Sequence, residues 1–148
     1  MSAFSDVYDG LRTFIPTILT THTELNNPYD IEDDSDIMYD KSWSLAIGPG
    51  ENTKRILCNY VTVERDYTLV LTRRYFAPSR DIDARVAAEK LMFEDQMLVI
   101  KALVNEPQTA SAEKISYNGD TGLQFIGGDR TGFLYLETSL LVEYFEQT

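Results

Sequence analysis

The feature that most constrains the fold is a run from about residue 82 to 104, where apolar residues recur at the three- and four-residue steps of an α-helix. Pro78 precedes the run and Pro107 follows it, so both ends carry a stop signal. Two apolar stripes predict a helix buried over much of its circumference, which organises the core. The first stripe consists of Ala84, Ala87, Ala88, Leu91, Met92, Leu98, Val99, Ala102 and Leu103, and the second of Ile82, Val86, Phe93, Met97, Ile100 and Val104.

On both sides of this helix the apolar pattern changes to a period of two, which predicts β-strands. Before the helix we expect strands at 42–47, 55–64 and 67–76, with a turn at 48–52 and a tight hairpin at Arg65-Asp66. After the helix we expect strands at 114–117, 123–126 and 131–146, with an Asn118-Gly119 hairpin. Because the last strand exceeds the usual length, a bend or bulge is expected near Thr138.

The first twenty residues predict an amphipathic helix that packs on the sheet, with a kink or break at Pro16. The expected order is therefore α-β-β-β-α-β-β-β over residues 1–148. Since the short connections favour antiparallel pairing, this order predicts one α+β domain. Its mainly antiparallel sheet would be packed by an N-terminal helix and one long central helix.

The overall charge argues against several classes of partner. The chain has 148 residues, with 13 Lys and Arg against 24 Asp and Glu, and a formal charge of −11. Such a surface repels phosphates and acidic lipids, which disfavours a sequence-specific nucleic-acid reader and a membrane-surface protein. The longest apolar run has four residues, whereas a membrane span needs about 20. The single cysteine excludes an intrachain disulfide.

No catalytic motif is recognisable. His22 is the only histidine, which limits zinc chemistry and histidine acid–base catalysis, and we interpret it as a capping or surface residue. Carboxylates are too abundant for any pair to stand out as catalytic, and no glycine-rich phosphate loop occurs. We therefore expect no enzyme activity, no catalytic residue, no bound metal and no cofactor.

An acidic run at 30–36 is the sharpest local feature. A calcium loop starting at its first acid would need glycine at the sixth position and glutamate at the twelfth, where Ser35 and Lys41 stand instead. The run is interpreted as a solvated loop, or as a surface that attracts a basic partner or repels a polyanion. As a candidate lumen or interface loop, it contributes Asp30, Glu32, Asp33, Asp34 and Asp36.

The densest basic group of this acidic chain comprises Arg73, Arg74 and Arg80, around the end of the third strand. It is either a solvated strand end or an inter-subunit contact that meets the acidic run of a neighbouring copy. Patches of opposite sign at different places on one molecule favour head-to-tail rings.

A family resemblance is carried by the element order together with three segments. These are Trp43-Ser44-Leu45-Ala46-Ile47-Gly48-Pro49-Gly50, Tyr67-Thr68-Leu69-Val70-Leu71 and Ile115-Ser116-Tyr117-Asn118-Gly119-Asp120. Over nearly its whole length the chain resembles the tail terminator proteins of long-tailed bacteriophages, which are also called tail completion or tail-to-head joining proteins.

The resemblance implies a virion structural protein that assembles in the host cytoplasm and ends up at the head-proximal end of the tail. Its subunits would form a hexameric ring that caps the tail tube, stops its growth and docks the head connector. The implied partners are further copies of the chain, the tail tube protein and a head-completion or connector protein. DNA would pass through the lumen without specific binding. Two alternatives stay open: another neck or tail component (a head-completion stopper or a tube subunit), and an unrelated small enzyme or cellular binding module.

Overall fold

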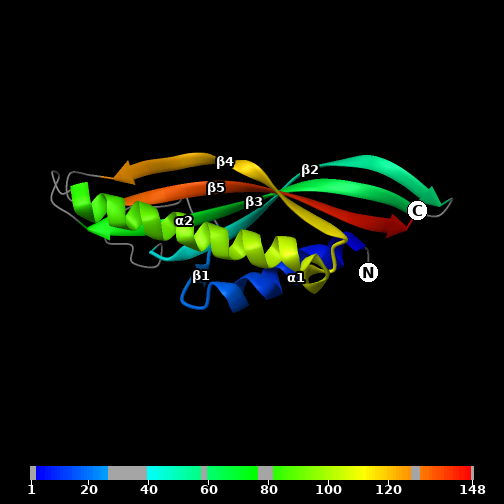
Figure 1. The fold of residues 1–148 in the computed structure, drawn as a ribbon, viewed down its shortest axis with the longest axis horizontal. Helices are drawn as coiled ribbons and strands as arrows, with labels where there is room; N and C mark the ends of the chain where they lie inside the picture. Colours follow the sequence, from blue (N-terminus) through cyan, green and yellow to red (C-terminus); the bar gives the residue numbers. More distant parts are fainter. Residues whose placement is uncertain (1–2, 27–39, 58–59, 77–81, 128–130, 148) are drawn as a thin grey trace.

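The computed structural model describes residues 3–26, 40–57, 60–76, 82–127 and 131–147 (Figure 1). The class is α+β, as expected, and the described strands form one sheet in the order β1-β2-β3-β5-β4. The elements in chain order are α1 (Ala3–Ile18), β1 (Thr23–Glu24), β2 (Ser42–Leu57), β3 (Tyr60–Phe76), α2 (Ile82–Asn105), the 3-10 helix η2 (Pro107–Ala110), β4 (Lys114–Gly127) and β5 (Thr131–Gln147).

The sheet is mixed, which corrects the expectation of a mainly antiparallel sheet. The short strand β1 pairs with β2 in parallel, with Thr23 beside Ser42 and Glu24 beside Trp43. The pairs β2–β3, β3–β5 and β4–β5 are antiparallel. A parallel pair needs a connection of about a dozen residues or more, and the segment between Glu24 and Ser42 is long enough.

The hairpin expected at Arg65-Asp66 is wrong, because β3 is a single strand of 17 residues. Both residues are paired within the sheet: Arg65 lies opposite Val142, and Asp66 lies opposite Leu141. The Arg65 guanidinium donates to the carbonyl of Gly48 at 3.1 Å and lies over the Phe4 ring at 5.3 Å. Through these contacts the Arg65 guanidinium is accommodated inside a strand, although in the sequence Arg65 suggested a turn.

The expected turn at 48–52 is also a strand segment. β2 continues through it with a register shift between Ile47 and Gly50. A β-carbon on Gly48 would lie 2.7 Å from the carbonyl oxygen of Asp66, so the glycine is required by a close backbone approach between β2 and β3.

The expected Asn118-Gly119 hairpin is wrong as well. Residues on both sides of it pair with β5, since Tyr117 lies opposite Leu140 and Leu123 opposite Leu136. The positive φ angles of Gly119 (104°) and Gly122 (74°) serve two irregularities inside β4. The irregularity expected in β5 near Thr138 lies instead in β4, its partner strand. Among the described residues, two strands and not three follow α2.

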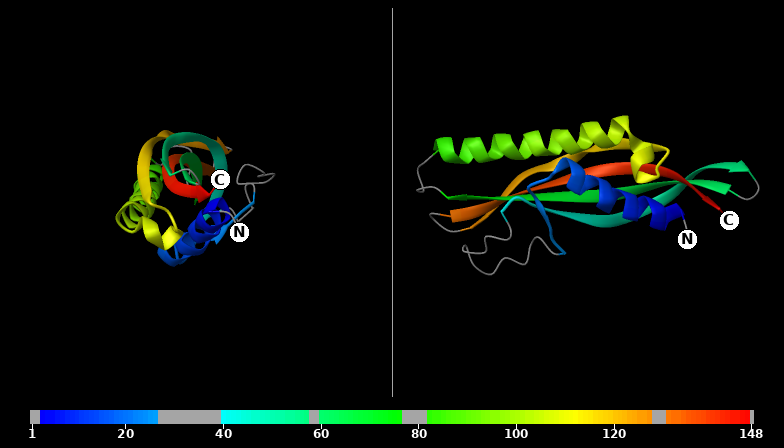
Figure 2. Two further views of the ribbon diagram at one scale, coloured as in Figure 1. Left: turned by 90° about the vertical axis from the view of Figure 1, so that its right-hand side faces the viewer. Right: turned by 90° about the horizontal axis from the view of Figure 1, so that it is seen from below.

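The molecule is elongated, and both helices lie on the same side of a strongly twisted sheet (Figure 2). The main core lies between the helices and this face of the sheet. Its largest fully buried side chains include Leu11 and Ile15 of α1, Met92 and Leu103 of α2, and Tyr67 of β3. A smaller buried cluster of Val70, Phe133 and Tyr135 lies apart from the main core and packs with Leu25.

The buried face of α2 comes mainly from the first predicted stripe, through Ala88, Met92, Val99 and Leu103, and the second stripe adds Ile100. The expectation of a helix buried over much of its circumference is wrong, because Leu91 (43%) and Leu98 (54%) of the first stripe are exposed, and so is most of the second stripe. Four of its six side chains remain exposed within the described structure: Ile82 (64%), Phe93 (39%), Met97 (40%) and Val104 (42%). An isolated subunit therefore leaves this apolar surface in water.

The two ends of the described chain lie close together (Figure 1). The Glu146 carboxylate of β5 accepts the backbone N–H groups of Ala3 at 3.2 Å and Phe4 at 3.1 Å. These donors belong to the first turn of α1, which has no intrahelical acceptors for them. A carboxylate also suits the positive end of the helix dipole. Pro16 does not break α1, which ends two residues later at Ile18.

We expect Glu146→Gln to lower the free energy of unfolding by about 1 kcal/mol, the usual value of an N-terminal capping contact. Urea denaturation followed by circular dichroism measures this change. Glu143→Gln, on the same strand, is the matched control, and it should change stability by less than about 0.5 kcal/mol, because Glu143 lies between Glu64 on one side and Lys114 on the other. Equal losses in the two variants would contradict a specific role for Glu146.

Candidate functional site

The residues predicted to form a site are only partly described. The acidic run Asp30, Glu32, Asp33, Asp34 and Asp36 lies outside the described residues, and so does Arg80. Arg73 and Arg74 are neighbours on β3, so strand alternation places their side chains on opposite faces of the sheet. The structure therefore separates two residues that looked like one basic patch.

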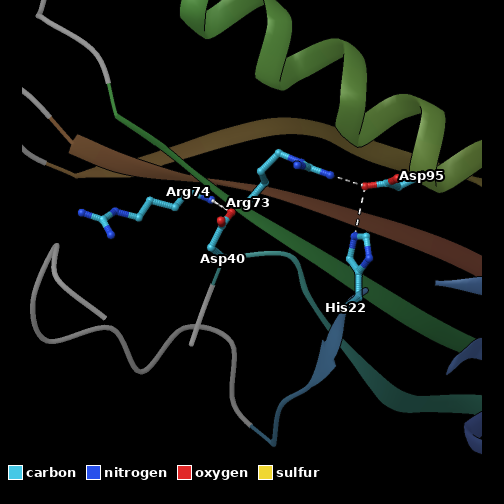
Figure 3. Close-up of polar contacts among 5 residues, drawn as sticks. All are labelled: His22, Asp40, Arg73, Arg74 and Asp95. Atoms are coloured by element: carbon cyan, nitrogen blue, oxygen red, sulfur yellow. Dashed lines mark hydrogen bonds and ion pairs between the residues drawn. The ribbon is translucent and has the colours of Figure 1, made fainter. Parts of the chain in front are cut away.

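Arg73 points toward α2 and is already paired within the chain (Figure 3). Its Nη2 donates to Oδ2 of Asp95 at 2.8 Å, and Nε2 of His22 lies 3.1 Å from the same oxygen. The side chains of His22, Arg73 and Asp95 are 6%, 11% and 17% exposed. Three elements thus meet at one carboxylate: the segment before β1, strand β3 and helix α2.

Burial by itself would raise the pKa of Asp95. The hydrogen bonds from His22 and Arg73 outweigh burial and hold the pKa of Asp95 below its usual value. The carboxylate is therefore the charged centre of this cluster at neutral pH. The expectation that His22 is a surface residue is wrong, because its ring is buried against Asp95.

Chemically, this cluster is a structural contact between α2 and the sheet. No described serine or cysteine has a hydrogen bond to His22, so a nucleophilic triad is not formed among the described residues. Both donors contact the same oxygen of a largely buried carboxylate, so the cluster ties α2 to the sheet. In the described part of the chain, no group of three His, Cys, Asp or Glu side chains could hold a metal ion.

Arg74 is anchored through its backbone, since its N–H donates to Oδ1 of Asp40 at 3.0 Å (Figure 3). Its Nε is buried and has no hydrogen-bond partner among the described residues. An inter-subunit role for Arg73, Arg74 and Arg80 stays a prediction. For Arg73 the internal pairing with Asp95 leaves little of the side chain available to a neighbour.

A second polar contact joins α2 to β4 and β5 through Gln96, which is 2% exposed. Its Nε2 donates to Oδ2 of Asp120 at 3.0 Å and to Oγ1 of Thr138 at 2.9 Å. The Tyr117 hydroxyl donates to the same Asp120 oxygen at 2.6 Å. This hydrogen bond and the one from Gln96 lower the pKa of Asp120. This network was not predicted from the sequence, although a glutamine within the apolar part of the helix was the available signal.

The face of the sheet opposite the helices carries a row of carboxylates. Glu51, Glu64 and Glu143 lie directly opposite one another on β2, β3 and β5, and Lys114 of β4 continues the row. Like charges at directly opposite positions destabilise a sheet unless water or counterions screen them. This row is therefore suited to a hydrated surface and not to a dry contact.

The exposed part of the second α2 stripe forms an apolar surface with strand β4. We call it the α2 ridge and define it by Phe93, Met97 and Val104 of α2 and Tyr117 of β4, which are 39–43% exposed. Two open grooves of about 470 and 460 Å³ border the ridge. The first is lined by Val86, Phe93 and Met97, and the second lies where Ile100 and Val104 face Ile115 and Tyr117.

No family model matches the chain, and no curated protein matches it either. None of the described helices has the length and apolar character that crossing a bilayer would require.

We expect Asp95→Asn to lower the free energy of unfolding at pH 7 by about 1–3 kcal/mol, because the hydrogen bonds to a charged acceptor are lost. Since the pKa of Asp95 is depressed in the folded state, its contribution is present above the ordinary carboxyl pKa and is lost as the pH falls through the folded pKa. The difference between wild type and variant should therefore shrink from pH 7 to pH 3.

Urea titrations at several pH values measure this difference. Glu94→Gln, the exposed neighbour on α2, should change stability by less than about 0.5 kcal/mol at pH 7. A gap between Asp95→Asn and wild type that stays constant down to pH 3 would show that the carboxylate charge is not what stabilises the contact.

Proposed function

We propose that this chain is a virion structural protein of the tail terminator type and not an enzyme. Six copies would form a ring that caps the tail tube of a long-tailed phage, ends tube polymerisation and provides the interface to the head connector. The ring would assemble in the host cytoplasm and remain in the virion at the head-proximal end of the tail.

The observation that carries the proposal is the α2 ridge. Isolated apolar residues on a surface are ordinary, but a contiguous apolar surface with polar borders marks a contact with another protein. Here the ridge extends along α2 and continues onto Tyr117 of β4. Such a surface fits a subunit that functions by association.

The described polar clusters support association over chemistry. Asp95 and Gln96 are each engaged by partners that join α2 to the sheet, and the hollow beside β1 and the two grooves beside α2 open to solvent. The hydrated carboxylate row and the formal charge of −11 suit a ring through which DNA passes without being held. The resemblance in the sequence supplies the specific role in the tail.

Negative-stain imaging and solution mass of the purified protein, with and without tail tubes, test the proposal. We expect six-fold rings or six-fold caps at tube ends. Met97→Arg should abolish them, because a charge in the middle of the ridge cannot be desolvated without a partner. Gln108→Arg, an exposed change on η2, is the control and should assemble normally.

A chain that stays monomeric at all concentrations and does not bind tube ends would contradict the proposal. Incorporation along the whole tube would favour a tube subunit, and binding only to the head connector would favour a head-completion stopper.

A further inference from the structure

We propose that the groove between the end of α2 and the edge strand β4 binds an extended segment of a partner protein. In this segment apolar and acidic residues would alternate, and its backbone would pair with β4 as an additional strand. The groove has a volume of about 460 Å³ and borders the C-terminal end of the α2 ridge. The inference rests on the proposed function in taking the ridge as a contact surface, and it adds the chemistry and the conformation of what is bound there.

Strand β4 supplies an open sheet edge on one side of the groove. It is the last strand of the described sheet, where β5 pairs with its inner side and no other described strand pairs with its outer side. Residues 114–117 pair with β5 in regular register, and the first irregularity follows Tyr117. Such an edge presents backbone N–H and C=O groups that the sheet itself does not use. A short extended segment can therefore form hydrogen bonds with this stretch.

The other wall of the groove is helix α2, and the surface between the two walls is apolar. Ile115 belongs to the main core, and Tyr117, two residues later on β4, points to the same face. Both lie beside Ile100 and Val104 of α2. Val104 and Tyr117 are exposed and available to a bound side chain, and the Tyr117 hydroxyl donates to Asp120 at 2.6 Å, which holds the ring in place. A groove between a sheet edge and a helix suits strand addition, because the backbone pairs with the edge while alternate side chains enter the groove.

The charged residues that line the groove are both lysines. Lys101 lies on α2 and Lys114 on β4, both are exposed, and neither forms an ion pair within the described residues. Glu106 and Glu113 are close in sequence but do not line the groove. On a chain with a formal charge of −11, two unpaired cations beside one apolar groove favour an acidic partner.

Lys114 also determines which segments can pair with β4. A lysine on an edge strand discourages indiscriminate strand pairing. A residue opposite Lys114 points away from α2, whereas a residue opposite Ile115 or Tyr117 points into the groove. A carboxylate at the first position would compensate the lysine charge, and apolar side chains at the others would cover the exposed surface. The geometry therefore selects apolar residues that alternate with acidic ones.

Binding of fluorescein-labelled octapeptides to the protein tests the inference. A first set alternates Val, Leu or Phe with Asp or Glu. A second set has Lys in place of the acids, and a third has the composition of the first with its apolar residues at three- and four-residue helical spacing. We expect members of the first set to bind in fluorescence polarisation, and the other two sets to bind at least about tenfold more weakly.

Substitutions in the groove locate the binding. Val104→Gln should weaken binding of the first set by about tenfold, because an apolar contact is lost. Lys101→Glu and Lys114→Glu should each weaken it by about fivefold. Lys90→Glu is the matched control, since Lys90 lies on the same helix beside the other groove, roughly 16 Å from Lys101. At about 0.15 M salt, charges at this distance are screened, and the control should bind as the wild type does.

Hydrogen exchange distinguishes strand addition from other modes of binding. We expect backbone amides within residues 114–117 to exchange more slowly when a peptide of the first set is bound, because their outward N–H groups become paired. Protection confined to α2 would overturn the strand pairing.

The remaining outcomes separate this inference from the proposed function. No binding by the first set, equal binding by the lysine set, or unchanged affinity in Val104→Gln would overturn it. Preference for the third set would overturn it in favour of a helical occupant, and a change in solution mass of Val104→Gln without an effect on peptide binding would overturn it in favour of a contact between copies.

Six-fold rings or tube caps without peptide binding would overturn the groove and leave the proposed function standing. Peptide binding by a chain that forms neither would support the groove and contradict the ring. Circular dichroism verifies that each variant folds, and the two exposed lysine variants decide the result if Val104→Gln does not.

Discussion

The uninterrupted pairing of β3 with β5 is the constraint on which the rest of this structure depends. The two strands are 17 residues long and stay in register from one end to the other. The neighbouring strands do not stay in register with this pair. β2 shifts register beside β3, and β4 contains extra residues beside β5. Both helices pack on one face of this central pair, so its length sets the length of the molecule (Figure 1).

Three long-range polar contacts attach the helices to that pair. Glu146 holds the start of α1, Asp95 joins α2 to His22 and Arg73, and Gln96 joins α2 to Asp120 and Thr138. Buried polar groups must be paired, so such contacts specify one orientation of a helix that apolar packing alone leaves adjustable. With its inner side held in this way, α2 presents the ridge outward in a defined position.

The described surface thus consists of unlike parts at different places on one subunit. The apolar α2 ridge lies beside one sheet edge, a polar hollow lined by Arg12, Glu24 and Asn26 lies at the other, and a row of carboxylates occupies the helix-free face. Unlike surfaces at opposite edges suit cyclic assembly, and a hydrated acidic face suits exposure to water within that assembly. These surfaces are the ones on which the proposed association of subunits depends.

The sequence alone was sufficient for the α+β class and the extent of α2, because these follow from residue-by-residue periodicity. Only the tertiary structure decided the turns. Asn118-Gly119 and Arg65-Asp66 both have residues typical of hairpin turns. In the structure, Arg65 and Asp66 are paired within β3, and Gly119 lies at an irregularity inside β4, because both strands follow the long β3–β5 pair. The exposure of most of the second α2 stripe could not be predicted from the apolar pattern either. Periodicity shows that a face is apolar, but whether the same chain covers that face depends on contacts between elements far apart in the sequence.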